Sequence, residues 1–423
     1  MSVRPTLAQT GCLAPRESDA LAVTEARARI LEHLAPVAGT LRLSVRQALG
    51  RALARDVICP VNVPAHTNSA MDGYAVRSED LPAGAPATLR VIGTAYAGHP
   101  FADPVQGGEC VRIMTGAALP AGTDTVVMQE QAVAEADGRV RLEGSHRRGQ
   151  NVRRAGEDLA AGRPALRAGQ RLMPAHLGLL ASLGVAEATV HRPPTVAFFS
   201  TGDELRSIGE PLGDGQIYDS NRYTLYGMLT RLGVDVMDMG VVRDRPQALR
   251  EAFTDAAAHA DALITTGGVS VGESDFVRQI LDERGRVQFW KIAMKPGRPF
   301  AFGRLGDCAF FGLPGNPVAA MVTFYQFVQP ALIHMAGDSD PLPVTVQVPC
   351  AERLTKKPGR TEFRRGILEA GPGGALTVRS SGQQGSGILS SMSRANCFLV
   401  LPAESETFAA GSPVEVQPFE GLV

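Results

Sequence analysis

The most regular hydrophobic pattern of the chain lies in its central part, where short apolar runs alternate with amphipathic ones. The runs at 195–200 and 262–266 are apolar almost without interruption, as in strands that are buried on both faces. The segments at 219–233 and 246–260 place apolar residues at helical spacing. Strands that alternate with helices at this spacing form parallel βαβ units. We therefore expect a central parallel α/β domain over residues 193–338.

Outside this domain the pattern changes three times. An amphipathic helix over 21–34 and a second short helix over 43–53 precede extended segments broken by prolines, which predicts a mixed α/β domain. Short alternating runs separated by Gly and Pro predict a small β domain inserted into it, and alternating strands return at the end of the chain. The expected limits are 18–86 plus 152–192 for the N-terminal domain, 87–151 for the inserted domain and 339–423 for the C-terminal β domain.

Length and composition limit the classes of protein to which this chain can belong. It has 423 residues, which is too long for one ordinary core, and its 44% hydrophobic and 20% charged residues are typical of a soluble globular protein. A net charge of −1 argues against nucleic acid as a partner. The six cysteines form no CxxC pair, and we find neither a signal peptide nor an apolar run of about 18 residues. We therefore expect a cytoplasmic protein with reduced thiols and no membrane partner.

Three predicted strands of the central domain end in segments that suit an anion. The first runs into Gly267, Gly268 and Gly272, the second carries two lysines, and the third stops at Pro314-Gly315-Asn316 before a long apolar helix. Free backbone N–H groups and nearby cations form anion sites at the carboxyl edge of an α/β sheet. The glycines form neither a dinucleotide fingerprint nor a P-loop, so ordinary nucleotide chemistry is not indicated.

Lys291 and Lys295 are an even number of residues apart, so on one strand they would share a face. Two ammonium groups on one face repel each other unless an anion lies between them. The alternative is a solvated edge strand with two unrelated lysines. We favour the anion, because the sheet is otherwise buried and Pro296-Gly297 turns the chain there.

Carboxylates follow the same set of strands. Asp203-Glu204, Asp244 and Asp275 each come after a different parallel strand, so we expect these segments to meet at one edge of the sheet. Carboxylate oxygens beside phosphate-binding loops suit Mg²⁺, which shares its ligands with substrate phosphates. The alternative for a single member, above all Asp275, is an acidic residue in the first turn of a helix.

Two further segments leave alternatives open. Ser386 and Gly387 precede a short helix and could form an oxyanion cradle, but a flexible Ser/Gly loop has the same composition. Arg364-Arg365 could bind an anion, although exposed arginine pairs are common. The eight histidines form no metal-binding pattern, so a histidine-bound metal is not expected.

Seven motifs in order extend this picture: SAMDGYAV, RIMTGA, VRRAGED, FFSTGDEL, TTGGVSVGESDF, FWKIAMKPGRPFAFG and LPGNPVAA. With them, over residues 18–420, the sequence resembles the molybdopterin molybdenumtransferase family of the bacterial MoeA type. It is similar as well to the E domains of gephyrin and of plant Cnx. The resemblance implies Mg²⁺-dependent insertion of molybdenum from molybdate into adenylylated molybdopterin, with release of AMP.

The resemblance also implies roles for particular residues. Metal ligands would be Glu204, Asp244 and Asp275, and the molybdate pocket would include Pro296, Arg365 and Ser386. The implied catalytic residues are Asp72, Asp158, Glu204, Asp244, Asp275, Lys291 and Lys295. The other implied substrate-binding residues are Thr115, Gly202, Asp203, Gly267, Gly268, Ser270, Gly272, Gly297, Pro314, Gly315 and Asn316.

In the family, the positions that Asp72, Thr115 and Asp158 match come from the second subunit of an elongated homodimer. The resemblance therefore implies a homodimer, with possible contacts to a molybdopterin adenylyltransferase and to molybdoenzymes. Two other functions stay open. One is adenylyltransfer itself, although those enzymes carry TTGGTG where this chain has TTGGVS, and they lack the flanking domains. The other is a scaffold that binds a partner peptide, as gephyrin does.

Overall fold

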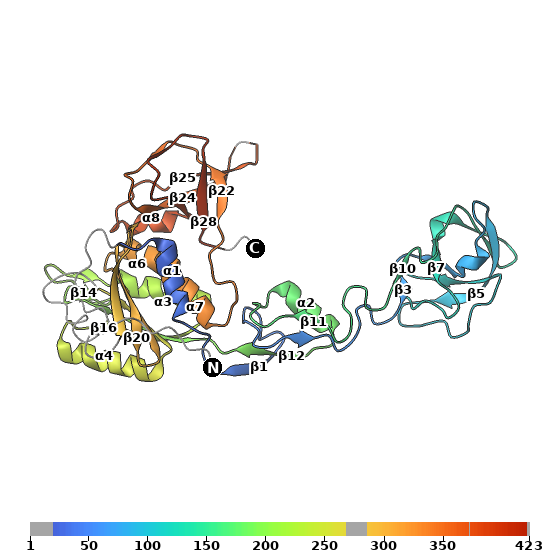
Figure 1. Ribbon diagram of the computed structural model, residues 1–423, viewed down its shortest axis with the longest axis horizontal. Helices are drawn as coiled ribbons and strands as arrows, with labels where there is room; N and C mark the ends of the chain where they lie inside the picture. Colours follow the sequence, from blue (N-terminus) through green and yellow to red (C-terminus); the bar gives the residue numbers. More distant parts are fainter. Residues whose placement is uncertain (1–19, 268–285, 372, 421–423) are drawn as a thin grey trace.

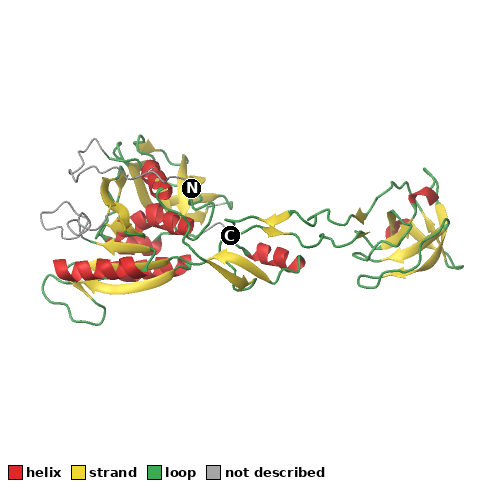
Figure 2. Ribbon diagram, turned by 60° about the horizontal axis from the view of Figure 1, so that its bottom comes forward, coloured by secondary structure: helices red, strands yellow, loops and turns green. Residues whose placement is uncertain are grey.

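The computed structural model describes residues 20–267, 286–371 and 373–420. A body of sheets and helices carries a long arm, and a small β domain lies at the far end of that arm (Figure 1). Figure 2 shows that the arm consists of extended segments running side by side between the body and the β domain. The multidomain α/β architecture expected from the sequence is thus confirmed.

A six-stranded sheet forms the centre of the body. Its order is β16 (Asp235–Val242), β13 (Thr195–Thr201), β17 (Ala262–Thr266), β21 (Cys308–Leu313), β20 (Pro299–Leu305) and β18 (Arg286–Lys291). The first four strands are parallel to one another. β20 runs antiparallel to both of its neighbours, β21 and β18. The carboxyl ends of the parallel strands therefore meet at one edge, as the sequence predicts.

Helices cover both faces of this sheet. Val196 and Phe198 of β13 face one large core, which α1 (Val23–Glu32) and α3 (Ser220–Leu232) also enter. The alternate residues Ala197 and Phe199 face a second core with α4 (Pro246–His259). Burial on both faces explains why this strand is apolar at nearly every position.

A long helical stretch, Pro317–Met335, joins the first of these cores. It consists of α6 (Pro317–Thr323), a π-helical turn η4 (Phe324–Val328) and α7 (Gln329–Met335). By length and composition alone it could cross a membrane, although Gln326, Gln329 and His334 interrupt its apolar residues. However, 78% of its most apolar window is buried inside the protein, so it is a core helix of the body.

The arm is built from three short strand pairs and one helix. The pairs are β1 (Thr40–Ser44) with β12 (Glu187–His191), β2 (Val57–Ile58) with β11 (Pro164–Leu166), and β3 (Asn68–Ser69) with β10 (Val152–Arg153). The helix α2 (Pro174–Ser182) packs on the first pair through Leu180, which shares a small core with Val190.

The helix predicted over residues 43–53 is wrong. Leu43 instead lies in β1, where it pairs with Ala188 of β12, and turns follow this strand. The apolar spacing that resembled a helix instead buries Ala48 and Leu53 in the small core of the arm. Local spacing could not reveal this, because the pairing partner lies far away in the sequence.

The arm is held to the body by an ion pair. Arg192 donates from both terminal nitrogens to the carboxylate of Asp261, at 2.6 and 2.7 Å. The same carboxylate accepts the backbone N–H of Thr195 at 2.8 Å, and Arg192 also donates to the carbonyl of Ala38 at 2.7 Å. This fork fixes the last strand of the arm against the first strand of the central sheet.

The β domain at the end of the arm has one six-stranded sheet. Its order is β7 (Thr125–Met128), β4 (Gly73–Val76), β6 (Glu109–Ile113), β5 (Ala87–Ala95), β9 (Arg139–Leu142) and β8 (Ala132–Ala134). The short turns η2 (Ser78–Asp80) and η3 (Gln129–Gln131) lie at strand ends. β4 lies within residues 18–86, which the sequence pattern assigns to the N-terminal domain. The sheet of the β domain therefore begins before residue 87.

The C-terminal domain is a second β sheet that packs on the body. Its order is β19 (Met294–Lys295), β24 (Thr361–Ala370), β26 (Cys397–Leu401), β28 (Pro413–Pro418) and β22 (Val346–Pro349), with β25 (Leu376–Ser380) beside β24. The same domain contains the strand pair β23 (Leu354–Thr355) and β27 (Thr407–Phe408) and the helix α8 (Leu389–Arg394). The central domain contains one further pair, β14 (Leu205–Arg206) and β15 (Ile217–Tyr218).

Candidate functional site

The glycine loops lie together at the carboxyl edge of the central sheet. Gly267 directly follows β17 with a left-handed φ of +89°, and a Cβ there would lie 2.6 Å from the carbonyl oxygen of Thr201. A Cβ on Gly315, just after β21, would lie 3.9 Å from the Cα of Gly267. The backbone turns after three neighbouring strands therefore lie within contact distance, where side chains would block a ligand.

Polar side chains beneath these loops hold them in place. Thr266 donates from its hydroxyl to that of Ser200 at 3.0 Å, and the Asn221 amide donates to the Gly315 carbonyl at 2.7 Å. The amide oxygen Oδ1 of Asn221 is buried and has no hydrogen-bond partner among the described residues. The sequence pattern predicts a helix over 219–233 and gives Asn221 no role at the site. The structure shows that Asp219 caps this helix, α3, since its carboxylate accepts the backbone N–H of Arg222 at 3.1 Å.

Carboxylates gather beside the same edge. The pKa of Asp244 is raised, first by burial and then by the negative charges of Asp203 and Glu204, so these three groups are near neighbours. Glu204 folds back over Gly202, where an added Cβ would lie 2.6 Å from a carboxylate oxygen. Within the described part of the chain, no three His, Cys, Asp or Glu side chains come close enough to hold a metal ion by themselves. Asp275, Gly268, Ser270 and Gly272 lie outside the described residues.

The prediction that Lys291 and Lys295 share one face of a single strand is wrong. Lys291 ends β18 in the central sheet, whereas Lys295 belongs to β19 in the C-terminal sheet. Between them, Ile292 donates its N–H to the Arg298 carbonyl at 2.8 Å, and Ala293 donates to the Leu21 carbonyl at 2.8 Å. This pairing with a distant segment bends the chain from one sheet into the other.

The ammonium of Lys295 lies against a carboxylate of the neighbouring strand. Lys295 and Glu362 are register partners in β19 and β24, and Lys295 Nζ donates to Glu362 Oε1 at 3.4 Å. Side chains alternate along β24, so Glu362 and Arg364 lie on one face and Phe363 and Arg365 on the other. The structure thus brings the Lys295 ammonium to Glu362 and directs Arg365 to the opposite face of the strand.

Arg365 is a buried cation. Its side chain is only 1% exposed, and it donates to the Ser391 hydroxyl at 3.0 Å and to the carbonyls of Gln383 and Gly385 at 3.2 and 3.0 Å. Burial lowers the pKa of the guanidinium to about 10. Among the described residues, none of its hydrogen-bond partners is a carboxylate, so its charge is uncompensated. A buried cation without a counter-charge suits an anionic ligand.

The start of α6 joins the loop at 383–386 to the central edge. Val318 donates its N–H to the Ser386 carbonyl at 3.1 Å, which places Ser386 against the first turn of α6. Asn316 occupies the N-cap position of α6 without a side-chain cap hydrogen bond, directly after Pro314 and Gly315. Pro296-Gly297 reaches α6 as well, because a Cβ on Gly297 would lie 2.5 Å from Thr323 Oγ1.

Replacing Gly297 with alanine should destabilise this junction. The residue has a φ of +93°, and the new methyl group would displace the buried Thr323, whose hydroxyl donates to the Ala319 carbonyl at 2.7 Å. We expect a loss of at least about 1–2 kcal/mol in the free energy of unfolding from the left-handed conformation alone, measured by urea denaturation. The matched control is Gly306→Ala, because Gly306 also has a positive φ of +60° but open space around it. Equal losses in the two variants would show that the contact with Thr323 is unimportant.

Asp72, Thr115 and Asp158 lie far from this edge within one chain. Asp72 Oδ1 accepts both the N–H and the hydroxyl of Thr115 at 2.7 Å, and these hydrogen bonds lower its pKa. Both residues belong to the β domain at the end of the arm, and Asp158 lies in the arm itself, where its N–H donates to the Val63 carbonyl at 3.1 Å. Figure 1 shows the arm extending away from the body.

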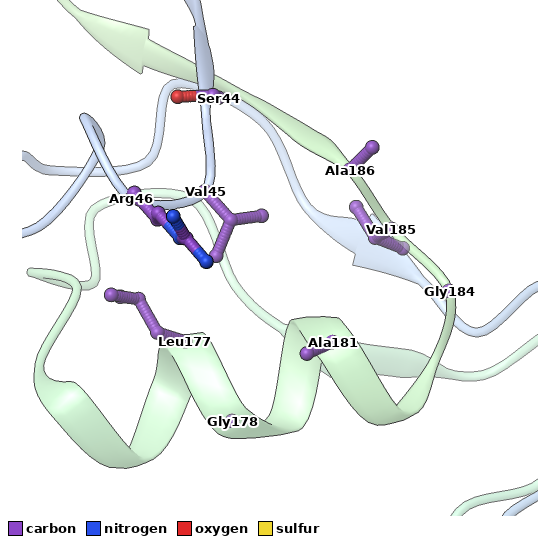
Figure 3. Close-up of a pocket in the computed structure, with 9 residues that line it drawn as sticks. All are labelled: Ser44, Val45, Arg46, Leu177, Gly178, Ala181, Gly184, Val185 and Ala186. Atoms are coloured by element: carbon purple, nitrogen blue, oxygen red, sulfur yellow. The ribbon is translucent and has the colours of Figure 1, made fainter.

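One open hollow of about 630 Å³ lies in the arm and not at this edge. Val45, Leu177, Ala181 and Val185 line it, with Arg46 as its charged residue (Figure 3). This lining offers few polar groups, so we do not assign the hollow to the anion and metal chemistry of the sheet edge.

Comparisons with known proteins cover nearly the whole chain. Residues 21–184 match the family model "MoeA N-terminal region (domain I and II)", residues 197–334 match "Probable molybdopterin binding domain", and residues 347–419 match "MoeA C-terminal region (domain IV)". The chain is similar to a molybdopterin molybdenumtransferase of Haemophilus influenzae, with 45% identity over 95% of this chain and 100% of that protein. A molybdopterin molybdenumtransferase of a Nostoc species is 38% identical over 87% of this chain and 86% of its own length.

A solved structure has the same architecture. The MoeA protein of molybdopterin biosynthesis from Pyrococcus horikoshii matches with a TM-score of 0.81 and 29% identity, over 95% of this chain and 100% of that one. The similarity in sequence and in fold extends over 95% of this chain. The chain therefore belongs to the molybdopterin molybdenumtransferase family.

Proposed function

We propose that this protein inserts molybdenum from molybdate into adenylylated molybdopterin, with Mg²⁺, and releases AMP. The observation that carries the proposal is the single edge of the central sheet where glycine turns, carboxylates and the start of α6 meet. Glycine turns suit the phosphates of an adenylylated substrate, and carboxylates suit a divalent cation beside those phosphates. We infer that the reaction takes place in the cytoplasm, since the five cysteines in the described part of the chain are free and buried.

The carboxylates at this edge fit Mg²⁺ in charge and in donor type. Burial raises the pKa of Asp244, and the negative charges of Asp203 and Glu204 raise it further, so a divalent cation would relieve that repulsion. Glu204 and Asp244 would hold the ion, together with Asp275 and the pyrophosphate oxygens, because Mg²⁺ usually takes few protein ligands. When bound, it would supply charge stabilisation to the leaving AMP phosphate.

The molybdate pocket would lie beside α6. Molybdate is a tetrahedral oxyanion, which needs cationic and hydroxyl donors. Arg365 and Ser386 offer such donors beside α6, and Lys295, on the opposite face of β24, offers a half-exposed ammonium group. The buried charge of Arg365 supports this role, because only an anion would compensate it. The chain then contributes by binding and orienting the two substrates and by supplying fixed positive charge, with no protein nucleophile.

The test is AMP release from adenylylated molybdopterin as a function of molybdate concentration. We expect release to require both molybdate and Mg²⁺. Adenylylated pterin that is bound but never cleaved would indicate a scaffold. Formation of the adenylylated pterin from ATP, without any need for molybdate, would indicate the preceding adenylyltransfer step.

We further propose a homodimer in which the β domain of one subunit completes the site of the other. Support comes from the position of Asp72 directly before β4 in the far β domain and of Asp158 in the arm. Figure 1 shows that β5 and β7 of this domain lie far from the body. We expect Asp72→Asn and Glu204→Gln to be inactive alone, while a mixed dimer regains up to about half of the activity because one of its two sites is intact. Absence of recovery, in mixed dimers whose formation is verified by mass spectrometry, would argue for a site within one chain.

A further inference from the structure

Glu362 is a buried carboxylate at the edge of the proposed site, and it contacts two cations. Its side chain is 8% exposed, and Oε2 accepts from Arg364 at 2.9 and 3.0 Å. Oε1 faces the other way and accepts from Lys295 Nζ at 3.4 Å. Glu362 therefore joins a half-exposed lysine of the proposed site to the interior of the C-terminal domain.

Arg364 holds the carboxylate in a fixed position. It is only 18% exposed and donates from a terminal nitrogen to the carbonyl of Thr355, the last residue of β23. Thr355 belongs to β23, which pairs with β27 in the same domain. Hydrogen bonds thus connect Thr355 to Arg364, Arg364 to Glu362 and Glu362 to Lys295. Because Thr355 and Glu362 each belong to a paired strand, these contacts fix the position of the Lys295 ammonium group.

An ammonium group has three donors, and Glu362 uses one of them. The Lys295 side chain is 55% exposed, so its other donors remain available to a ligand. An oxyanion could therefore bind Lys295 without displacing Glu362. Without Glu362, the long side chain of the lysine would sample many rotamers, and binding would have to order it.

We propose that Glu362 is a positioning residue for the oxyanion step, acting through Lys295. The proposal rests on the proposed function, because it assigns Lys295 to molybdate. It adds a residue whose role the family resemblance does not supply. It predicts that Glu362 matters for molybdate dependence and hardly at all for binding of the pterin nucleotide.

Glu362→Gln is a suitable test, since an amide accepts hydrogen bonds at only one of its two ends. The oxygen should keep the shorter contact with Arg364, and the NH₂ group would then face Lys295 as donor against donor. We expect the molybdate concentration for half-maximal AMP release to rise about threefold to tenfold. Binding of adenylylated pterin should stay unchanged. An unchanged or lowered molybdate requirement would overturn the proposal.

The matched control is Glu369→Gln. Glu369 lies on the same strand and pairs with Arg379 at 2.8 Å, but both side chains are 45% exposed and neither contacts a residue of the proposed site. This variant should behave like the wild type. A decisive comparison places Glu362→Gln in a Lys295→Ala background. If Glu362 acts through the lysine, it should have no further effect there, whereas an additive loss would mean a general structural role.

A second readout does not depend on activity. Acetic anhydride should acetylate Lys295 about two- to fivefold faster in Glu362→Gln than in the wild type, because the ion pair no longer restrains Nζ; peptide mass spectrometry measures this. Equal rates would show that the contact does not hold the lysine and would overturn the proposal. If the wild type shows no molybdate-dependent AMP release, the proposed function fails, and the role of Glu362 in it fails too. Faster labelling would then still report the contact itself.

Discussion

Replacing Arg365 with methionine is expected to weaken molybdate binding by about tenfold to a hundredfold, because a charge-assisted hydrogen bond contributes roughly 1.5–3 kcal/mol. Arg365 is buried, and its partners within the described ranges, Ser391, Gln383 and Gly385, carry no negative charge. An oxyanion would supply the missing negative charge. Titration calorimetry with molybdate measures the change directly.

The same substitution should leave the protein folded. The pKa of Arg365 in the folded state, about 10, lies below the ordinary value of 12.5, so folding disfavours the charged form. That cost is fully present below the folded pKa and disappears as the pH rises from the folded value towards the unfolded one. Methionine removes the cost but takes a donor from the Ser391 hydroxyl and from the Gln383 carbonyl, whereas the Gly385 carbonyl still accepts the N–H of Ile388 at 3.3 Å. Since these effects oppose each other, we expect the free energy of unfolding to change by less than about 2 kcal/mol.

Two further variants separate charge from geometry. In Arg365→Lys the positive charge remains, but an ammonium group lacks the planar, forked donors with which the guanidinium binds its three acceptors. Its molybdate affinity should therefore lie between those of the wild type and of Arg365→Met. Arg379→Met removes an exposed arginine from the neighbouring strand β25 and should bind molybdate normally. Unchanged affinity in Arg365→Met would mean that the guanidinium only supports the loop at 383–385.

Local patterns predicted the parts of the fold that depend on local sequence. The apolar runs at 195–200 and 262–266 become β13 and β17 in the parallel sheet. The helix expected from 246 begins at Pro246, and the helix α3 ends at Gly233 with a left-handed φ of 72°. These signals survive because each of them needs only neighbouring residues.

The errors share a physical cause, which is pairing between distant segments. Leu43 lies in a strand because β12 pairs with it, and its apolar neighbours only mimic helical spacing. Lys291 and Lys295 belong to different sheets because Leu21 pairs with Ile292 and bends the chain there. No periodicity near residue 292 records the presence of a partner so far away in the sequence.

The candidate site shows the same division. Glycine turns and carboxylates at strand ends were visible in the sequence, because the parallel sheet brings such ends together. Asn221 and Glu362 were not visible. Asn221 reaches Gly315 across the fold, and Glu362 meets Lys295 only because β19 and β24 are register partners. A side chain that positions another residue has no sequence pattern of its own.

Replacing Asp244 with asparagine is expected to raise the Mg²⁺ concentration for half-maximal AMP release by about tenfold or more, since a lost charged ligand contributes roughly 1.5–3 kcal/mol. Asp244 follows the end of β16, close enough to Asp203 and Glu204 for their charges to raise its pKa further after burial. Binding of the adenylylated pterin should change far less, because phosphate contacts to the glycine turns remain. Titrating Mg²⁺ against AMP release measures the effect.

Without Mg²⁺, we expect the same substitution to stabilise the folded protein, because it removes the buried charge of Asp244. Its pKa is raised in the folded state, chiefly by burial, so the ionised form is disfavoured by folding. The cost is absent at low pH, appears as the pH rises through the raised pKa and persists at neutral pH. Asp244→Asn should therefore unfold at a higher temperature than the wild type in EDTA, and Mg²⁺ should stabilise it less.

Asp235→Asn is the control for both measurements, because Asp235 is exposed at the opposite end of the same strand. It should leave the Mg²⁺ midpoint and the thermal gain from Mg²⁺ unchanged. A metal ligand must move both quantities in Asp244→Asn, lowering the gain from Mg²⁺ and raising the Mg²⁺ requirement. A variant that is more stable in EDTA but has a normal Mg²⁺ midpoint would mean that Asp244 only crowds Asp203 and Glu204. The ion would then be held by other groups, and Asp244 would have to be removed from the proposed metal site.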